Sequence, residues 1–223
     1  MSKQLVTNKE KGDYTMTDLK TDRTKTLELE KLNIVDKNGT VRLSLFNNEN
    51  IPPAIMDGKD MLPGHRQNDP IAGLLFYNKE GDECGGLIYG NEVDENGKMT
   101  AGASLTFDQY KQDQVVQMKY SEDEYGFYLY DRPSTPLSQI LEKHEEVENS
   151  NLSTEMKEQE INELWKGNVT RGYMGKDPNR EVAVKLMDSK GNDRIRMVID
   201  EFDVPRMEFL DGDGKVIYKL PPD

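Results

Sequence analysis

A short turn sequence that begins with Asp or Asn and ends three residues later with Gly occurs five times in the chain, at 36–39, 78–81, 94–97, 188–191 and 211–214. The pattern is typical of a type I turn, in which the Asx side chain accepts from backbone two residues on and the glycine takes a left-handed conformation. Alternating apolar and polar residues flank the copies, which predicts β-hairpins. We therefore expect a mainly β chain, an antiparallel meander that is either barrel-like or a sandwich.

Two stretches interrupt the hairpin pattern. A connection at 47–70 contains four prolines, and the stretch at about 135–166 has helical periodicity. In the second stretch Thr135 is the expected N-cap with Pro136 at the first helical position, and a second helix should begin at Ser153 or Thr154. We expect residues 1–25 to be a flexible tail and 26–223 to be a single β-rich domain that carries an inserted αα-hairpin.

The composition predicts a thin hydrophobic core. Hydrophobic residues make up 35% of the chain, charged residues make up 32%, and the mean hydropathy is −0.82. Globular chains are typically about 45–50% apolar. Two explanations remain open at this point: one face of the sheet is solvated, as antiparallel sheets allow, or a second subunit completes the burial.

The net charge of −13 and the even spread of Lys and Arg argue against nucleic-acid binding. With Cys84 as the single cysteine, the chain cannot form an intrachain disulfide. The sequence has neither a run of about 18–20 apolar residues nor a signal-peptide pattern, so direct membrane insertion is not expected. The expected location is the cytoplasm, or the cell envelope if an anchoring segment has been trimmed.

The strongest candidate for chemistry is the polar segment 107–114. Its two carboxylates, Asp108 and Asp113, could line a site for a polar ligand such as a glycan, together with Gln109, Tyr110 and Gln114. Paired carboxylates, with Asp131 as a third candidate, are also what glycoside hydrolysis requires. The alternative is a polar connection whose side chains bond to backbone groups.

The 47–70 connection is the second candidate, because long ordered loops in compact domains are often functional. It carries His65 and Arg66, which we take as ligand-binding candidates along with Arg132, and it could instead simply cover a sheet edge. His65 could activate Cys84 as a nucleophile, whereas His144 falls on an apolar helical face. Neither an EF-hand calcium loop nor a structural zinc site is expected, and no cofactor is implied.

The chain resembles a family of bacterial proteins that have no assigned function. The residues that carry the resemblance are 32–39 (LNIVDKNG), 75–81 (LFYNKEG) with 85–87 (GGL), 105–110 (LTFDQY) with 112–114 (QDQ), 131–133 (DRP), and 209–211 (FLD) with 214–215 (GK). The resemblance spans about 32–221 and implies no activity. Some similar chains begin with a membrane-anchoring segment, which implies an envelope location for those chains.

These observations favour a non-enzymatic binding or assembly module that forms a homo-oligomer. A hydrolase of polar substrates that uses Asp108, Asp113 or Asp131 is the alternative. A third possibility is an envelope-associated partner protein. The hairpin pattern itself is explained by turn chemistry, so a functional site is expected where that pattern is absent.

Overall fold

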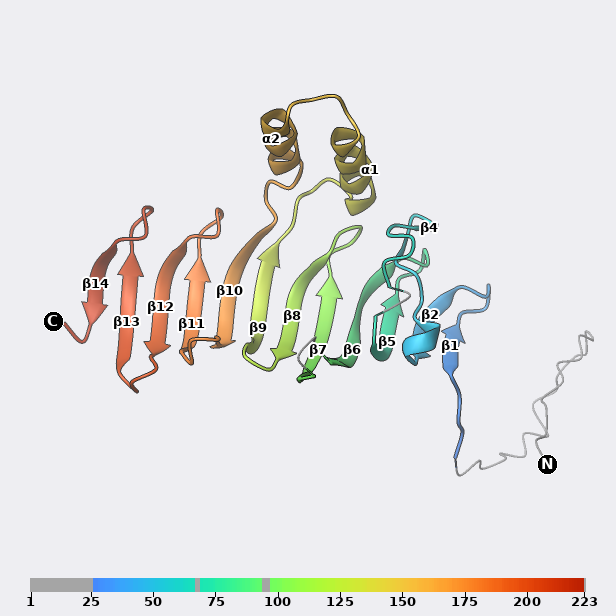
Figure 1. Ribbon diagram of the computed structural model, residues 1–223, viewed down its shortest axis with the longest axis horizontal. Coiled ribbons are helices and arrows are strands. Elements are labelled where there is room, and N and C mark those ends of the chain that lie inside the picture. The colour runs from blue at the N-terminus through green and yellow to red at the C-terminus, as the bar shows by residue number, and fades with distance from the viewer. Residues whose placement is uncertain (1–25, 67–68, 94–96, 223) are drawn as a thin grey trace, which may run out of the picture.

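The computed structural model describes residues 26–66, 69–93 and 97–222, and the N-terminal tail expected at 1–25 lies outside these ranges. Twelve strands form one antiparallel sheet in which neighbours along the chain are also neighbours in space (Figure 1). They are β1 (Lys31–Val35), β2 (Val41–Phe46), β5 (Ile71–Tyr77), β6 (Glu83–Val93), β7 (Met99–Asp108), β8 (Gln114–Ser121), β9 (Tyr125–Asp131), β10 (Val169–Lys176), β11 (Val182–Met187), β12 (Asp193–Ile199), β13 (Pro205–Leu210) and β14 (Val216–Leu220).

The expected antiparallel meander is confirmed, and the sheet is open, with β1 and β14 as its edges. The barrel-like form is therefore not adopted. The connection between β2 and β5 contains a short 3-10 helix, Asn48–Asn50, and a small ribbon of β3 (Ile55–Met56) and β4 (Lys59–Asp60). The expected helical pair is inserted between β9 and β10 as α1 (Leu137–Glu148) and α2 (Thr154–Leu164).

The turn chemistry that the sequence predicts is present in four copies, while 94–96 of the fifth copy lie outside the described ranges. In the first copy Asp36 Oδ1 accepts from the backbone N–H of Asn38 at 2.8 Å, and Gly39 has φ +84°. Side chains of Asn78, Asp188 and Asp211 make the equivalent bond. The same geometry also occurs without glycine at Asp200, where Asp203 takes the left-handed position with φ +62°.

The helix starts were predicted only in part. Thr135 is not the N-cap of α1: Pro136 occupies that position, and the N–H of Leu137 donates to the carbonyl of Lys111 at 2.8 Å. This bond to another segment starts the helix one residue later than local sequence suggests. Ser153 does cap α2, by accepting from the N–H of Met156.

The strand register aligns apolar side chains across the whole sheet. Directly paired positions on one face form a single row with one residue from each of the twelve strands: Leu32, Leu45, Leu74, Leu87, Leu105, Met118, Phe127, Met174, Val184, Met197, Met207 and Leu220. Every member of this row is apolar and none is fully buried. We call the face that carries this row the apolar face.

The adjacent row of paired residues is offset by one position in each strand, so its side chains lie on the opposite face. This row contains both polar and apolar residues. Its members are Asn33, Ser44, Leu75, Gly86, Thr106, Gln117, Tyr128, Tyr173, Lys185, Arg196, Glu208 and Lys219. The two buried hydrophobic clusters include members of this row: Leu75 packs with Phe46 and Tyr77, and Tyr128 packs with Tyr173. The small core therefore lies on the opposite face.

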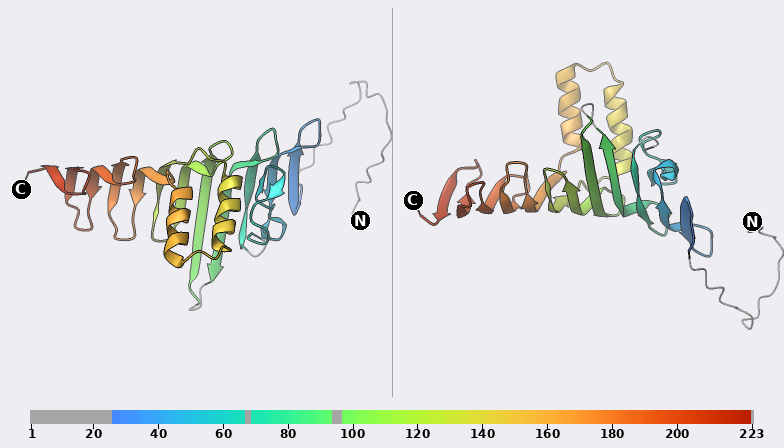
Figure 2. Two further views of the ribbon diagram at one scale, coloured as in Figure 1. Left: turned by 90° about the horizontal axis from the view of Figure 1, so that it is seen from above. Right: turned by 60° about the horizontal axis from the view of Figure 1, so that its bottom comes forward.

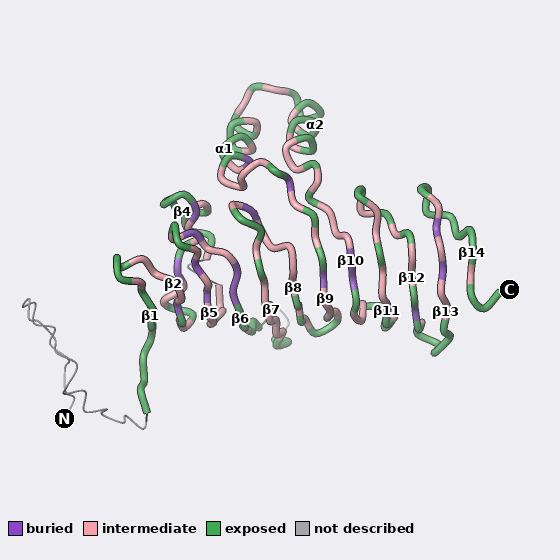
Figure 3. The backbone as a smooth tube through the Cα atoms, turned by 180° about the vertical axis from the view of Figure 1, so that it is seen from behind, coloured by how far each residue is buried: buried purple, intermediate pink, exposed green. Residues whose placement is uncertain are grey.

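The connecting segments also lie on the opposite face. Residues of the 47–70 connection line a hollow together with opposite-face residues such as Leu75 and Thr106. The helical hairpin and this connection extend from the same side of the sheet (Figure 2). Buried positions form short stretches within the strands, while the turns are largely exposed (Figure 3). The sheet is thus covered in places on one face, and its apolar face is left open.

Candidate functional site

The 47–70 connection and the 107–114 segment, the two places singled out from sequence, meet in one cleft on the opposite face. The cleft has a volume of about 330 Å³. Its polar lining includes five sequence candidates: His65, Arg66, Asp108, Asp113 and Gln114. A volume near 300 Å³ is at the small end of the range for ligand pockets.

A lysine at the tip of the β7–β8 turn holds the walls of this cleft together. Lys111 Nζ lies 2.6 Å from Asp57 of the connection, 2.9 Å from Glu80 and 2.7 Å from Asp82 of the β5–β6 turn. Ser138 of α1 donates to the same Asp57. The ammonium therefore joins three segments directly, and Asp57 links them to α1. The hydrogen bonds that the ammonium donates to these carboxylates raise the pKa of Lys111, which keeps the ammonium charged.

An arginine–glutamate pair forms one side of the cleft. Arg66 donates to Glu83 through both terminal nitrogens, at 2.6 and 2.9 Å, in the bidentate geometry that makes such pairs strong. The two side chains are 23% and 17% exposed, so the pair is largely shielded from water. Glu83 and Lys111 were not predicted as site residues, because their partners lie far away in the sequence.

Asp108 is the most perturbed carboxyl group in the cleft. Burial raises its pKa to about 7, and the nearby charges of Asp113 and Glu83 contribute to the rise, while Arg132 and Arg66 oppose it. The environment thus places this carboxyl group where it exchanges a proton near neutral pH. Buried carboxyl groups with such values are used as general acids in enzymes.

The second carboxylate of the cleft is held in place by its neighbours. Asp113 Oδ1 accepts from the N–H of Gln114 at 2.9 Å, and its Oδ2 lies 3.8 Å from Arg132. Arg132 is anchored in turn, because its Nε donates to the carbonyl of Gln114 at 2.6 Å and its guanidinium lies over the ring of Tyr130. Arg132 contacts the cleft residues Asp113 and Gln114 but does not itself line the cleft.

Other candidates lie outside the cleft. Asp131 is exposed and pairs with Arg171 on an adjacent strand, so it is not placed with Asp108 and Asp113. Tyr110 is 67% exposed and bonds Glu80, and Gln109 shapes the turn through backbone bonds.

The two residues considered for nucleophilic chemistry are not set up for it. Cys84 does not line the cleft with His65, and burial raises the pKa of its thiol. His144 accepts from the indole N–H of Trp165 at 3.1 Å, as expected of a packed histidine.

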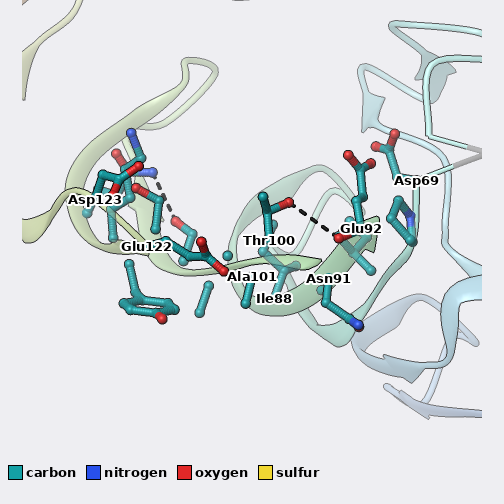
Figure 4. A pocket seen from close by; sticks show the side chains of 18 of the residues that line it. Asp69, Ile88, Asn91, Glu92, Thr100, Ala101, Glu122 and Asp123 are labelled. Atoms are coloured by element: carbon teal, nitrogen blue, oxygen red, sulfur yellow. Dashed lines mark hydrogen bonds between the residues drawn. The ribbon is translucent and has the colours of Figure 1, made fainter. Parts of the chain in front are cut away.

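A second hollow of about 520 Å³ continues from the cleft toward the β6–β7 hairpin and shares Asp69, Ile88 and Gln117 with it. Figure 4 shows Glu92 and Asp69 on one side of this hollow and Glu122 and Asp123 on the other. The carboxylates outnumber the lysines in the lining, Lys98 and Lys119. Anionic ligands are therefore disfavoured along this surface.

The apolar face is the other surface that calls for an explanation. Seven members of its central row are at least 39% exposed: Leu32, Leu45, Leu87, Met118, Met174, Met197 and Leu220. The accessible surface is 16822 Å², whereas a compact monomer of 25.5 kDa exposes about 10,400 Å². Even if the 31 residues outside the described ranges are given the full surface of an unfolded chain, about 5,000 Å², the excess is about 1,400 Å².

Within the described ranges, no group of three or more His, Cys, Asp or Glu side chains is arranged to hold a metal ion. No helix in this part of the chain is long and apolar enough to cross a membrane. Comparison of the chain with known protein families and with curated proteins found no match. Any statement of function must therefore come from the geometry alone.

Proposed function

We propose that this chain is a non-enzymatic assembly module, which works as a homo-oligomer through its apolar face. The observation that carries the proposal is the unbroken apolar row across all twelve strands. Exposed apolar patches larger than a few hundred Å² mark interaction sites. One face of an antiparallel sheet can be polar and exposed to water. Here every strand has an apolar residue in the central row of this face instead. This indicates a surface that is buried when the protein works.

Sedimentation combined with binding of an apolar fluorescent dye tests this proposal. We expect an oligomer at micromolar concentration that binds little dye, because subunit contacts cover the apolar face. A stable monomer that binds no dye would contradict the proposal. In that case the apolar face would be neither covered by another subunit nor able to bind an apolar partner.

Hydrolysis of a polar substrate is a second candidate function, which the position of Asp108 and Asp113 in one cleft favours. Asp108, with a pKa raised to about 7, would act as the general acid, and Asp113 as the base or nucleophile. The cleft is open to a neutral substrate such as a glycan segment. The candidate Asp131 is not part of this pair.

Release of reducing sugar from a panel of neutral polysaccharides tests this second candidate. Activity that falls by about 100-fold or more in both Asp108→Asn and Asp113→Asn would support it. The matched control is Asp131→Asn, which changes the same functional group outside the cleft and should retain activity. If the wild-type protein releases no sugar from any substrate, or if the three variants behave alike, the pair has no hydrolytic role.

A further inference from the structure

We propose that the apolar face is covered by a second copy of this chain, in a two-fold sandwich of two twelve-stranded sheets packed face to face. The inference rests on the proposed function and names the partner and its arrangement. In such an isologous contact the same surface serves both subunits, so each apolar row is buried by its own copy. Aligned sheets that pack in this way lie about 10 Å apart.

The dimensions of the sheet match those of a stable dimer. Twelve strands about 4.8 Å apart span roughly 55 Å, and about six residues per strand give a length near 20 Å. Each copy therefore offers about 1,000 Å², and two copies bury about 2,000 Å². Permanent homodimers bury about 2,000 Å² or more in total. A partner must be as long as the sheet itself, and a second copy meets this condition.

The chemistry of the face is self-complementary. The central row carries no charged side chain in any of its twelve described members. A second parallel row continues the pattern across the C-terminal half with Leu186, Ile195, Phe209 and Tyr218. Two copies of this uncharged central row can meet without burying an unpaired charge, although each subunit has a net charge of −13.

The C-terminal hairpins provide the most direct argument. On their opposite face Lys185, Arg196 and Glu208 form a charged ladder, in which Arg196 lies 2.6 Å from Glu208. The large apolar side chains of β11–β13, such as Met197, therefore point to the apolar face. A hollow of about 620 Å³ on that face is lined by Met174, Met197 and Met207, among others. A facing copy would complete the hydrophobic core of this half.

Residues 1–25 of the same chain are a poorer match for the face. They contain six hydrophobic and ten charged residues, whereas the central row alone presents twelve apolar side chains. Covering the row with this segment would place charges against it, at a cost of several kcal/mol for each unpaired charge. The second copy is therefore the occupant that the composition favours.

Sedimentation equilibrium of the full chain, with paired variants, tests the sandwich. Leu186→Asp places a charge on the apolar face, and Lys185→Gln changes the net charge by the same amount on the opposite face. Leu87→Asp places a charge on the apolar face in the N-terminal half of the sheet. We expect twice the 25.5 kDa monomer mass for wild type and Lys185→Gln, and a rise of about 100-fold or more in the dimer Kd for both aspartate variants.

Each other outcome is decisive. A trimer or a longer polymer would overturn the two-copy sandwich and leave the assembly function standing. A monomer, whether or not it binds apolar dye, would overturn both. A dimer that neither aspartate variant weakens must use another surface. If the variants do not fold, wild-type thermal unfolding decides, because the Tm of a dimer rises with protein concentration and that of a monomer does not.

Discussion

The ammonium of Lys111 lies 2.7 Å from the carboxylate of Asp82, whose side chain is only 2% exposed. Asp82 also accepts from the backbone N–H of Asp57 at 2.7 Å. The pair joins the β7–β8 turn to the β5–β6 turn and to the 47–70 connection. The connection is thus held on the sheet by polar contacts as well as by apolar packing.

Lys111→Met should lower the free energy of unfolding by about 3 kcal/mol, because Asp82 would be left buried without its counter-charge. The matched control is Lys79→Met, at an exposed position of the neighbouring turn, which should change stability by less than about 0.5 kcal/mol. Urea denaturation of both variants checks the difference. Equal stabilities would show that the three carboxylates around Lys111 do not depend on it.

The contribution of Asp108 to the stability of the protein should fall as pH rises from about 4 to 7. The pKa of Asp108 is raised from 3.8 to about 7 in the folded protein, so over this range the folded state holds a proton that the unfolded state has lost. Above pH 7 this contribution is constant. The full shift corresponds to at most about 4 kcal/mol.

Asp108→Asn should remove that part of the pH dependence, since the amide does not titrate. Urea denaturation at pH 5, 6, 7 and 8, at one protein concentration, measures it. Asp213→Asn, in an exposed turn, is the control and should keep the wild-type profile. Parallel profiles for Asp108→Asn and wild type would rule out a titrating Asp108 in this range.

Arg66→Met should raise the pKa of Asp108 further. Arg66 lowers that pKa in the wild type and also neutralises Glu83, which raises it. The substitution should in addition cost about 2–3 kcal/mol of stability, since Glu83 would lose its bidentate partner. A carbon-detected NMR titration of the Asp108 carboxyl group gives the pKa, and an unchanged or lower value would contradict the geometry.

Gly175→Ala should destabilise the β9–β10 pair by about 2 kcal/mol. A Cβ at this position would lie 2.2 Å from the carbonyl oxygen of Tyr125 and 2.7 Å from the Cα of Gly126, so backbone would have to move. Gly102→Ala is the control, because its nearest neighbour would be 3.7 Å away. Thermal unfolding of the two variants should differ by several degrees, and similar Tm values would refute the close approach.

Local chemistry made the hairpins predictable from sequence. An Asp or Asn at the first turn position and Gly at the fourth are sufficient to specify a reversal, and the structure confirms this at Asp36, Asn78, Asp188 and Asp211. The helix start at Thr135 was wrong, because the bond from Leu137 to Lys111 comes from a distant segment. The turn at Asp200 does not match the pattern, since its fourth residue is Asp203 and not glycine.

The cleft was predictable only as a set of separate candidates. His65 and Asp108 are far apart in the sequence, and the fold of the 47–70 connection over the sheet brings them into one cleft. Asp131 has the same side chain as Asp108 and lies at the end of a nearby strand, yet its partner Arg171 holds it elsewhere. The apolar face could be predicted in part, because apolar and polar residues alternate within the strands. Its continuity depends on register between strands, which the turn lengths set and which single strands do not reveal.

The strictly sequential strand order has a consequence for how such a sheet can change in length. Each strand is bonded only to the strands before and after it along the chain, so inserting or deleting one whole hairpin would leave every remaining pairing intact. The sheet would then grow or shrink in increments of roughly 10 Å, the width of two strands. Chains built on this plan could act as molecular rulers, with a reach set by the number of hairpins encoded.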